Sequence, residues 1–321
     1  VDNKTYINDD VVTADVKMNL PDPSKLALPL SNVTVTDDYS KFAGDVDLVG
    51  WRAVENGTDV TDQYHVVSNA TGVLSIARND PANAPAGTVD LITTFKIHDD
   101  VPNKTQLVNS GSGRINNHTV PTNNESIVTY TQTAEKHWVE GGQTVDDQTY
   151  IDGDQVHAQV VMSLPNHSDL AKPLSDVSLT DNYSKFANDV TYHGAQVYEN
   201  NVDVTDQYTI ANANGQVVAT RKDATKAPSG EVKLVVNFVT NNNLPSGTQL
   251  VNTGSGRINN HTVNTNTAKV VTYLQNTDKH WVEGSQNVDG KTYVDGDQVH
   301  GHVTMTLPTP TTKSDRSHVV L

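Results

Sequence analysis

The sequence predicts an all-β protein built from tandem immunoglobulin-like β-sandwich domains. Short runs of alternating apolar and polar residues are broken about every 8 to 12 residues by Gly, Pro, Asn or Asp, as in a sandwich of antiparallel strands. No helical periodicity is sustained. Residues 105–120 also return almost unchanged as residues 248–263. A repeat of this length can bury its own core, so we expect a string of separately folded domains.

The strands of the first copy can be followed in order. Residues 33–37 alternate Val with Thr and Asp, and residues 89–97 and 126–132 show the same period of two. Each run therefore places its apolar residues on one face of a strand. Asn-Gly pairs at residues 56–57, and at residues 214–215 in the second copy, predict two-residue hairpin turns.

The copies are delimited by the motif K-H-W-V-E-G, which begins at Lys136 and again at Lys279. We expect this motif to lie on the opening strand of a copy. The predicted domains are residues 1–134, a first copy without its opening strand, 135–277, a complete second copy, and 278–321, the truncated start of a third. The Pro- and Thr-rich, charged stretch 308–321 is predicted to be disordered or artificial.

Composition excludes several classes of function. The chain has 22 Lys and Arg against 38 Asp and Glu, a formal net charge of -16, and no Cys. This negative field repels nucleic acid and anionic membrane surfaces, and disulfides or thiolate metal sites are impossible. No apolar run approaches the roughly 20 residues that cross a bilayer, and no leader opens the chain. Any export or anchoring signal is expected outside this fragment.

Polar residues on apolar faces form the candidate site. Period-two alternation puts Asp181 on the side of its apolar neighbours in residues 177–183, Lys136 on the side of Trp138, and Asn260 on the side of Ile258. An amine, a carboxyl group and a carboxamide are thus predicted to face one core. Burial lowers a lysine pKa and raises an aspartate pKa, so a neutral amine could attack the carboxamide while the acid transfers protons. The product would be a Lys136–Asn260 isopeptide bond.

The other copies hold parts of the same set. Copy one has Asp37 and Asn117 but no lysine, and copy three has Lys279 but no partner. Asp181 is the predicted catalytic residue, with Asp37 its equivalent. The chemistry is a single intramolecular turnover, so we do not expect an enzyme in the ordinary sense.

Several motifs, in the same order, resemble the C-terminal domains of antigen I/II-type adhesins. They are V-D-G-K-T-Y-V-D-G-D-Q-V-H-G-H-V-T-M-T-L-P at residues 288–308, T-D-D-Y-S at 36–40, V-E-N-G-T-D-V-T-D-Q-Y at 54–64, and G-x-G-x-x-N-N-x-T-V ending at Val120. Related domains occur in the aggregation substances that Gram-positive bacteria display during conjugation. The resemblance covers copies one and two and the start of three.

The resemblance implies a variant immunoglobulin fold in a cell-wall-anchored stalk on a Gram-positive surface. It also implies a Lys–Asn isopeptide with an Asp catalyst, whose residues fall on Lys136, Asp181 and, near the end of the late strand, Asn260. A departure is His261, which separates Asn260 from Thr262. The implied function is a spacer in an adhesin, aggregation or virulence protein, whose partners are host or neighbouring-cell surface molecules reached through the parent protein. We expect this segment to be monomeric in solution.

Simpler interpretations of the same residues stay open. Lys136 could be a strand lysine with its ammonium group in water, and Asp181 and Asp37 could cap turns. The first Asn of each Asn-Asn pair, Asn116 and Asn259, is expected to form a turn.

A different class of function is a domain that binds host protein or glycan, with calcium held in Asp-rich turns at residues 59–62 and 203–206. No metal site is predicted from the histidines, because none shows ligand spacing. We therefore expect no cofactor, with calcium as the alternative. A hydrolase would need a recurring pair of carboxylates around a cleft, which the repeats do not show.

Overall fold

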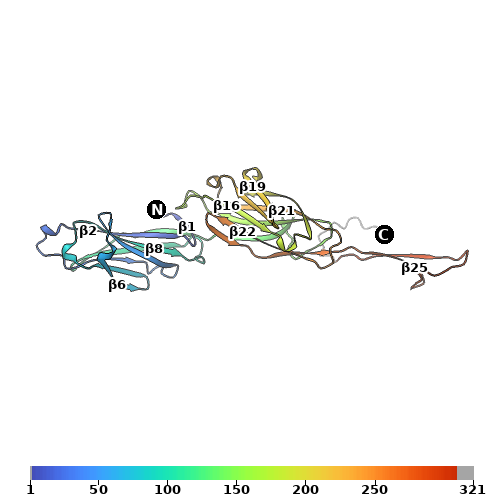
Figure 1. Ribbon diagram of the computed structural model, residues 1–321, viewed down its shortest axis with the longest axis horizontal. Helices are drawn as coiled ribbons and strands as arrows, with labels where there is room; N and C mark the ends of the chain where they lie inside the picture. Colours follow the sequence, from blue (N-terminus) through green and yellow to red (C-terminus); the bar gives the residue numbers. More distant parts are fainter. Residues whose placement is uncertain (1, 309–321) are drawn as a thin grey trace. The chain divides into compact units, whose positions relative to one another are not determined.

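A computed structural model describes residues 2–308, and it is made almost entirely of β-strands, as Figure 1 shows. This confirms the predicted fold class. The stretch from residue 309 onward, predicted to be disordered, lies outside the described residues. The chain divides into two compact units: unit 1 is Val1–Gln132 with the loop Pro165–Pro173, and unit 2 is Thr133–Leu164 with Leu174–Leu321. Residues 278–308 are thus grouped with unit 2, and the predicted separate third domain stays a prediction.

Unit 1 consists of two sheets. The first has the order β1-β11-β9-β3-β7-β6, with β10 also paired to β9, and the second has the order β2-β8-β4-β5. The strands are β1 (Thr5–Ile7), β2 (Val11–Leu20), β3 (Val33–Asp38), β4 (Val46–Glu55), β5 (Thr58–Asp59), β6 (Tyr64–Ala70), β7 (Val73–Arg78), β8 (Gly87–Ile97), β9 (Gln106–Ile115), β10 (His118–Pro121) and β11 (Glu125–Tyr130).

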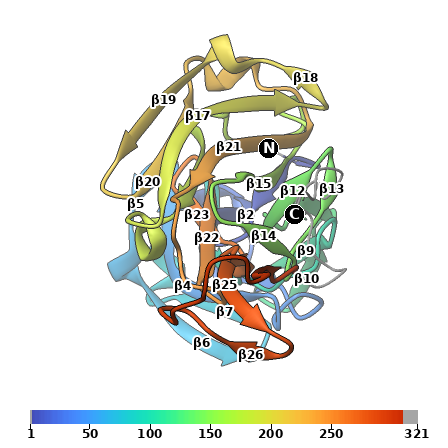
Figure 2. The same ribbon diagram turned by 90° about the vertical axis from the view of Figure 1, so that its right-hand side faces the viewer.

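Unit 2 repeats this plan with one important addition. Its sheets have the orders β14-β24-β22-β16-β20-β19, with β23 on β22, and β13-β12-β15-β21-β17-β18. In Figure 2 the ribbons of β12, β15, β21 and β17 follow one another in that order. The strands are β12 (Ala134–Glu140), β13 (Gln143–Thr144), β14 (Thr149–Ile151), β15 (Gln155–Leu164), β16 (Val177–Asn182), β17 (Val190–Glu199), β18 (Val202–Asp203), β19 (Tyr208–Ala213), β20 (Gln216–Arg221), β21 (Gly230–Thr240), β22 (Gln249–Ile258), β23 (His261–Asn264) and β24 (Ala268–Tyr273).

The start of the third copy forms a small sheet of its own, in the order β26-β25-β27. Its strands are β25 (Thr277–Glu283), β26 (Gln286–Asn287) and β27 (His300–Met305). The only helical segments among residues 2–308 are single 3-10 turns: η1 (Pro23–Lys25), η2 (Thr61–Gln63), η3 (Pro81–Asn83), η4 (Ser184–Phe186), η5 (Thr205–Gln207) and η6 (Ala224–Lys226). None of these is long or apolar enough to cross a membrane.

The G-x-G part of the repeated motif brings the two sheets close together. In unit 2 a Cβ on Gly254 would lie 2.5 Å from the Thr180 carbonyl oxygen and 2.8 Å from Val160, and one on Gly256 would lie 2.5 Å from the sulfur of Met162. Gly111 and its neighbours repeat this arrangement in unit 1. These glycines lie on β9 and β22 and face β2 and β15. Their role is close packing between sheets.

An aromatic cluster forms the centre of each core. In unit 1 Tyr39 and Phe42 pack on Phe95, with ring centroids 4.9 Å and 5.8 Å from it. Unit 2 has the equivalent Tyr183, Phe186 and Phe238, and adds the fully buried Trp138 of β12, 5.7 Å from Phe186. Strand β12 therefore completes the core of unit 2, and no strand among residues 2–308 takes the corresponding place in unit 1.

Candidate functional site

Strand β12 brings the predicted lysine into the core of unit 2. Lys136 and Trp138 alternate with residues that reach the surface, and Lys136 has an exposed fraction of 0%. Strand β12 pairs with β15, where Lys136 lies opposite Val160. The side chain of Asn266 fixes the position, since it accepts a hydrogen bond from the Lys136 N–H at 2.8 Å and donates one to its carbonyl at 2.9 Å. The alternative of a water-exposed lysine is wrong.

Three polar side chains meet behind this strand. The Nζ of Lys136 is hydrogen-bonded to Oδ2 of Asp181 on β16, and both side chains are fully buried. Asn252 on β22 is also fully buried, and its Nδ2 donates to the same carboxylate, 3.0 Å from Oδ1 and 3.3 Å from Oδ2. The structure thus gathers an amine, a carboxyl group and a carboxamide from three strands of two sheets.

The asparagine in this site is Asn252, whereas the sequence pattern pointed to Asn260. Strand β22 ends at Ile258, and the next two residues form the turn to β23. Asn259 has a φ of 53° in that turn, and Asn260 is exposed. Alternation holds only inside a strand, so extending it through a turn gave the wrong residue. Counted backwards from Ile258, every second residue of β22 is buried, and Asn252 is one of them.

The same correction applies to copy one. Asn117 is exposed in the turn between β9 and β10, and Asn109 on β9 takes the place that Asn252 has in unit 2. The first residue of each Asn-Asn pair forms the turn as expected. Asn116 has a φ of 52°, and its Oδ1 accepts the Ser31 N–H at 2.7 Å.

The aspartates that face the core are not the ones that cap the following turn. In T-D-D-Y-S the second acid, Asp38, accepts the Ser40 N–H at 3.1 Å, and Asn182 makes the equivalent bond to Ser184 at 3.2 Å. Asp37 and Asp181 precede these capping residues and are fully buried. Adjacent residues of a strand point to opposite faces, so the first residue of each pair faces the core and the second caps the turn.

Burial sets the proton affinities in both sites. Desolvation lowers the pKa of Lys136, and the neighbouring Asp181 opposes that shift. In unit 1, which has no lysine at this position, burial raises the pKa of Asp37 to about 6, against the hydrogen bonds from Thr93 and Asn109 that favour the charged form. Among residues 2–308, Oδ1 of Asp37 and Oδ1 of Asn109 have no hydrogen-bond partner. The acid and the amide of the site are thus in place in unit 1.

The raised pKa of Asp37 predicts a pH-dependent stability of unit 1. Its folded pKa, about 6, lies above the ordinary aspartate pKa of 3.8, so the folded state binds more protons than the unfolded state in that interval. The contribution of Asp37 to the free energy of unfolding is therefore fully present below about pH 4. It falls by roughly 2 to 3 kcal/mol as the pH rises through about 6. The variant Asp37→Asn should be more stable than the parent at neutral pH and lose the advantage near pH 4.

Urea unfolding of both proteins across this range measures the effect, and the difference between them removes the contribution of other carboxylates. A constant difference at all pH values would contradict the assignment.

The lysine of the third copy is placed differently from Lys136. Lys279 is exposed on β25, and its Nζ lies 5.8 Å from the ring centre of Trp281, which is itself 47% exposed. Strand β25 therefore exposes its lysine and tryptophan to solvent, whereas β12 buries the equivalent lysine and tryptophan in the core of unit 2.

In the Asp-rich turns the first aspartate accepts hydrogen bonds from the threonine two residues further along the chain. Asp59 accepts the N–H and the hydroxyl of Thr61 at 3.0 and 2.7 Å, and Asp203 does the same with Thr205. These hydrogen bonds lower the pKa of both aspartates. Within residues 2–308 no group of three or more His, Asp and Glu could hold a metal ion. The absence of a cofactor, and the calcium alternative, both stay predictions.

Each unit holds a second buried polar cluster, which was not predicted from the sequence. Glu199 accepts hydrogen bonds from Arg221 Nε at 2.6 Å and from the Tyr208 hydroxyl at 2.8 Å, and Glu55, Arg78 and Tyr64 repeat the arrangement in unit 1. The glutamate and tyrosine belong to the repeated motif V-E-N-G-T-D-V-T-D-Q-Y of unit 1, and Y-E-N-N-V-D-V-T-D-Q-Y of unit 2. Recurrence of a charged residue beside an Asn-rich turn was the available signal.

No protein-family model matches this sequence, and no curated protein matches it. Among solved structures, the C-terminal domain of the antigen I/II polypeptide BspA from Streptococcus agalactiae is similar, with a TM-score of 0.68, 13% identity, and coverage of 84% of this chain and 96% of the other. The C-terminal domain of the antigen I/II-family protein AspA from Streptococcus pyogenes gives 0.67, 15%, 84% and 95%. The resemblance seen in the motifs is thus confirmed at the level of fold: this chain has the fold of antigen I/II C-terminal domains.

Proposed function

We propose that this chain is a stalk segment of a cell-wall-anchored surface adhesin of a Gram-positive bacterium, braced by a self-formed amide bond between Lys136 and Asn252. The observation that carries the proposal is the fully buried contact of Lys136 and Asn252 with one carboxyl group, Asp181. The fold shared with antigen I/II C-terminal domains supports the surface location.

The reaction needs only these three side chains. Desolvation favours the neutral amine of Lys136, which attacks Cγ of Asn252. The Nζ–Cγ bond forms and the Cγ–Nδ2 bond breaks. Asp181 accepts a proton from Nζ and delivers one to the departing nitrogen, which leaves as ammonia. An amine and a primary amide thus become a secondary amide and ammonia, with no change of oxidation state.

Packing in the core accelerates the amide-forming reaction by holding the reacting groups in contact. Holding reactants in contact is worth an effective concentration of roughly 10⁵ M or more, which compensates for the low reactivity of an amide. Oδ1 of Asn252 has no hydrogen-bond partner among residues 2–308. A half-turn of the amide would exchange the bonds from Nδ2 to Asp181 for a contact of Oδ1 with the same carboxyl group, which can donate to it once it carries the proton taken from Nζ. Donation to this oxygen polarises the carbonyl group during attack.

The bond would make the domain a mechanical tether. Strand β12 opens the second copy, and β22 is one of the last strands of that copy and lies in the opposite sheet. A covalent link between them carries a pulling force past most of the intervening strands. By analogy with a disulfide that closes a loop of about 100 residues, it should also stabilise the fold by roughly 4 to 5 kcal/mol.

The remaining expectations form part of the proposal. The chain acts as a spacer, the only chemistry is one turnover, and contacts with host or neighbouring cells, aggregation and conjugation belong to the parent protein. No observation on the described residues favours a glycan-binding or hydrolytic function over this one.

Intact-mass spectrometry of the denatured chain tests the proposal. We expect the monomer to be one ammonia lighter than its sequence. The variants Lys136→Ala, Asp181→Ala and Asn252→Ala should each restore that ammonia, and Asn260→Ala should not. A parent protein with the full mass of its sequence would rule out the crosslink. If Asn260→Ala restored the missing ammonia, the crosslink would involve Asn260 and not Asn252.

A further inference from the structure

The two Asn-Gly pairs of the sequence form the same kind of turn. Residues 56–57 join β4 to β5, and residues 214–215 join β19 to β20, each as a two-residue hairpin loop. This confirms the turns predicted from the sequence. The φ angles are 50° and 82° in the first turn and 54° and 72° in the second. Positive φ at both central residues is the mark of a type I′ turn.

The side chains of the two asparagines differ in their contacts. Nδ2 of Asn56 donates to the Ala86 carbonyl at 3.0 Å, and Oδ1 of Asn56 accepts the Thr88 N–H at 2.9 Å. Within residues 2–308 the Asn214 side chain makes no hydrogen bond or ion pair. Both asparagines are exposed. The two turns therefore differ in how the amide is held and not in its access to water.

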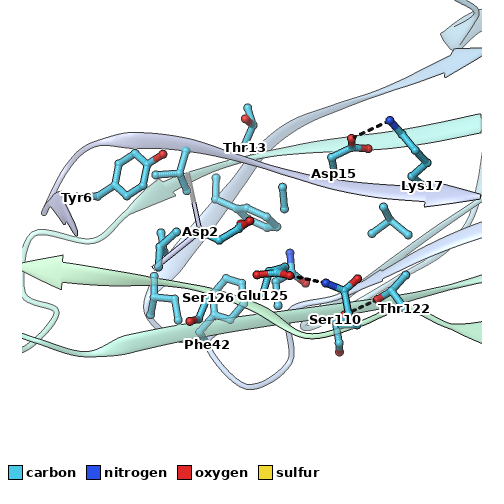
Figure 3. Close-up of a pocket in the computed structure, with 18 residues that line it drawn as sticks. Asp2, Tyr6, Thr13, Asp15, Lys17, Phe42, Ser110, Thr122, Glu125 and Ser126 are labelled. Atoms are coloured by element: carbon cyan, nitrogen blue, oxygen red, sulfur yellow. Dashed lines mark hydrogen bonds and ion pairs between the residues drawn. The ribbon is translucent and has the colours of Figure 1, made fainter. Parts of the chain in front are cut away.

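An Asn-Gly pair is the sequence in which the backbone can attack a side chain most easily. The nitrogen of the following residue lies next to Cγ of the asparagine, and attack closes a cyclic imide. Glycine has no Cβ that would crowd this nitrogen. Every other asparagine of the chain is followed by a larger residue. Asn109, for example, lines the pocket of unit 1 drawn in Figure 3 and is followed by Ser110, which is labelled there.

Ring closure requires a rotation that only one of the two turns allows freely. The peptide between the two central residues must turn so that its nitrogen meets Cγ. Type I′ and type II′ turns share a positive φ at the first central residue, so this peptide can flip while β19 and β20 stay paired. The side chain of Asn214 is free to follow. In the first turn both hydrogen bonds of Asn56 must break first, which should slow the reaction roughly tenfold or more.

We infer that Asn214 is a site of spontaneous deamidation, and that Asn56 is protected from the same reaction. The Gly215 nitrogen gives up its proton and bonds to Cγ of Asn214, and the Cγ–Nδ2 bond breaks as ammonia leaves. Water from the solvent then opens the imide. Opening at Cγ gives aspartate, and opening at the main-chain carbonyl carbon gives isoaspartate. In sum, an amide and water become an acid and ammonia, with no change of oxidation state.

The turn at Asn214 is packed closely against the end of β16. The Gly215 carbonyl accepts the Tyr183 N–H at 2.8 Å, and a Cβ on Gly215 would lie 2.5 Å from Cα of Ser184. Isoaspartate lengthens the main chain by one methylene group, which a two-residue loop at fixed register cannot absorb in place. The modification would therefore loosen the end of the strand that carries Asp181.

Incubation of the full chain in water enriched in the heavy oxygen isotope tests the inference, because each deamidation incorporates one solvent oxygen. We expect peptide mapping to find the label at Asn214 roughly tenfold or more faster than at Asn56. The unfolded chain in urea should label both sites at similar rates. The variant Asn214→Gly keeps a residue suited to positive φ and should remove the label from this turn.

A matched variant of unit 2 separates the effect of the hydrogen bonds from that of the sequence. Asn200 is held as Asn56 is, since its Nδ2 donates to the Ser229 carbonyl at 3.0 Å and its Oδ1 accepts the Glu231 N–H at 3.0 Å. Asn201→Gly therefore creates a third Asn-Gly pair with a held amide. We expect Asn200 of this variant to label as slowly as Asn56. Equal rates at Asn200 and Asn214, or no label at Asn214 in the folded chain, would overturn the inference.

The inference does not depend on the proposed crosslink, and mass separates the two. Completed deamidation replaces ammonia by water and makes the chain heavier, whereas the crosslink makes it lighter by one ammonia. The cyclic imide alone would mimic the crosslink, but it cannot form in Asn214→Gly. A parent chain that loses ammonia but takes up no label at Asn214 would refute the deamidation and leave the proposed function standing. Label at Asn214 in a chain without ammonia loss would do the reverse.

Discussion

Replacing Asp181 by alanine should be among the most destabilising single changes in unit 2. The variant leaves the Lys136 amine fully buried without its partner and also prevents the proposed crosslink. A buried amine without a hydrogen-bond partner costs about 1 to 3 kcal/mol, and the lost crosslink adds to that cost. Urea unfolding followed by the fluorescence of buried Trp138, with Trp51 and Trp281 changed to Phe, measures the loss.

Two controls separate the contributions. Lys269→Ala removes one partner of an exposed pair, in which the Lys269 and Asp147 side chains are 45% and 71% exposed, so it should cost no more than about 1 kcal/mol. The double variant Lys136→Met with Asp181→Leu removes both buried polar groups and should recover about 1 to 3 kcal/mol relative to Asp181→Ala, although it cannot crosslink. Equal losses for Asp181→Ala and Lys269→Ala would contradict the interpretation.

Glu199→Ala should destabilise unit 2 by about 3 to 5 kcal/mol. Glu199 is 5% exposed and accepts hydrogen bonds from Arg221 and Tyr208, so its loss leaves a guanidinium group buried at 7% exposure without its counter-charge. The same environment raises the pKa of Tyr208, through burial first and then through Glu199. Thermal and urea unfolding measure the cost.

The matched control is Glu231→Ala in the same unit. Glu231 pairs with Lys233 at 2.6 Å, but its side chain is 44% exposed, so we expect a change of at most about 1 kcal/mol. The equivalent change Glu55→Ala should act on unit 1 and leave the unfolding of unit 2 unchanged. Similar costs for Glu199→Ala and Glu231→Ala would show that the buried cluster does not stabilise the fold.

The fold could be predicted from the sequence because its signals are local. Alternation within residues 33–37 and 177–183 assigned strands and placed Asp37 and Asp181 in the core, and the structure has both residues fully buried. The recurrence of K-H-W-V-E-G likewise identified β12 and the inward side chains Lys136 and Trp138. Each of these inferences stayed inside one strand, where a period of two is reliable.

The asparagine could not be predicted in this way because a turn intervenes. Asn260 and Asn252 both lie an even number of residues from Ile258, but only Asn252 lies on strand β22. The end of β22 at Ile258 is decided by its pairing with β16 and β23. Which even-numbered residue meets Asp181 depends on the register between β16 and β22, where Asp181 lies opposite Gly254. Register depends on how two strands pair, so the sequence of one strand alone does not determine it.

The amino-acid sequence alone determined the repeat, the strands, the acidic and cysteine-free character, and two of the three core polar residues. Tertiary structure decided the choice of Asn252 and the burial of Glu199 with Arg221. The physical reason is that local periodicity fixes only the side of a strand on which a residue lies. Contacts between side chains also require the stagger and spacing of two sheets, which here depend on glycines such as Gly254 and Gly256 that allow close approach.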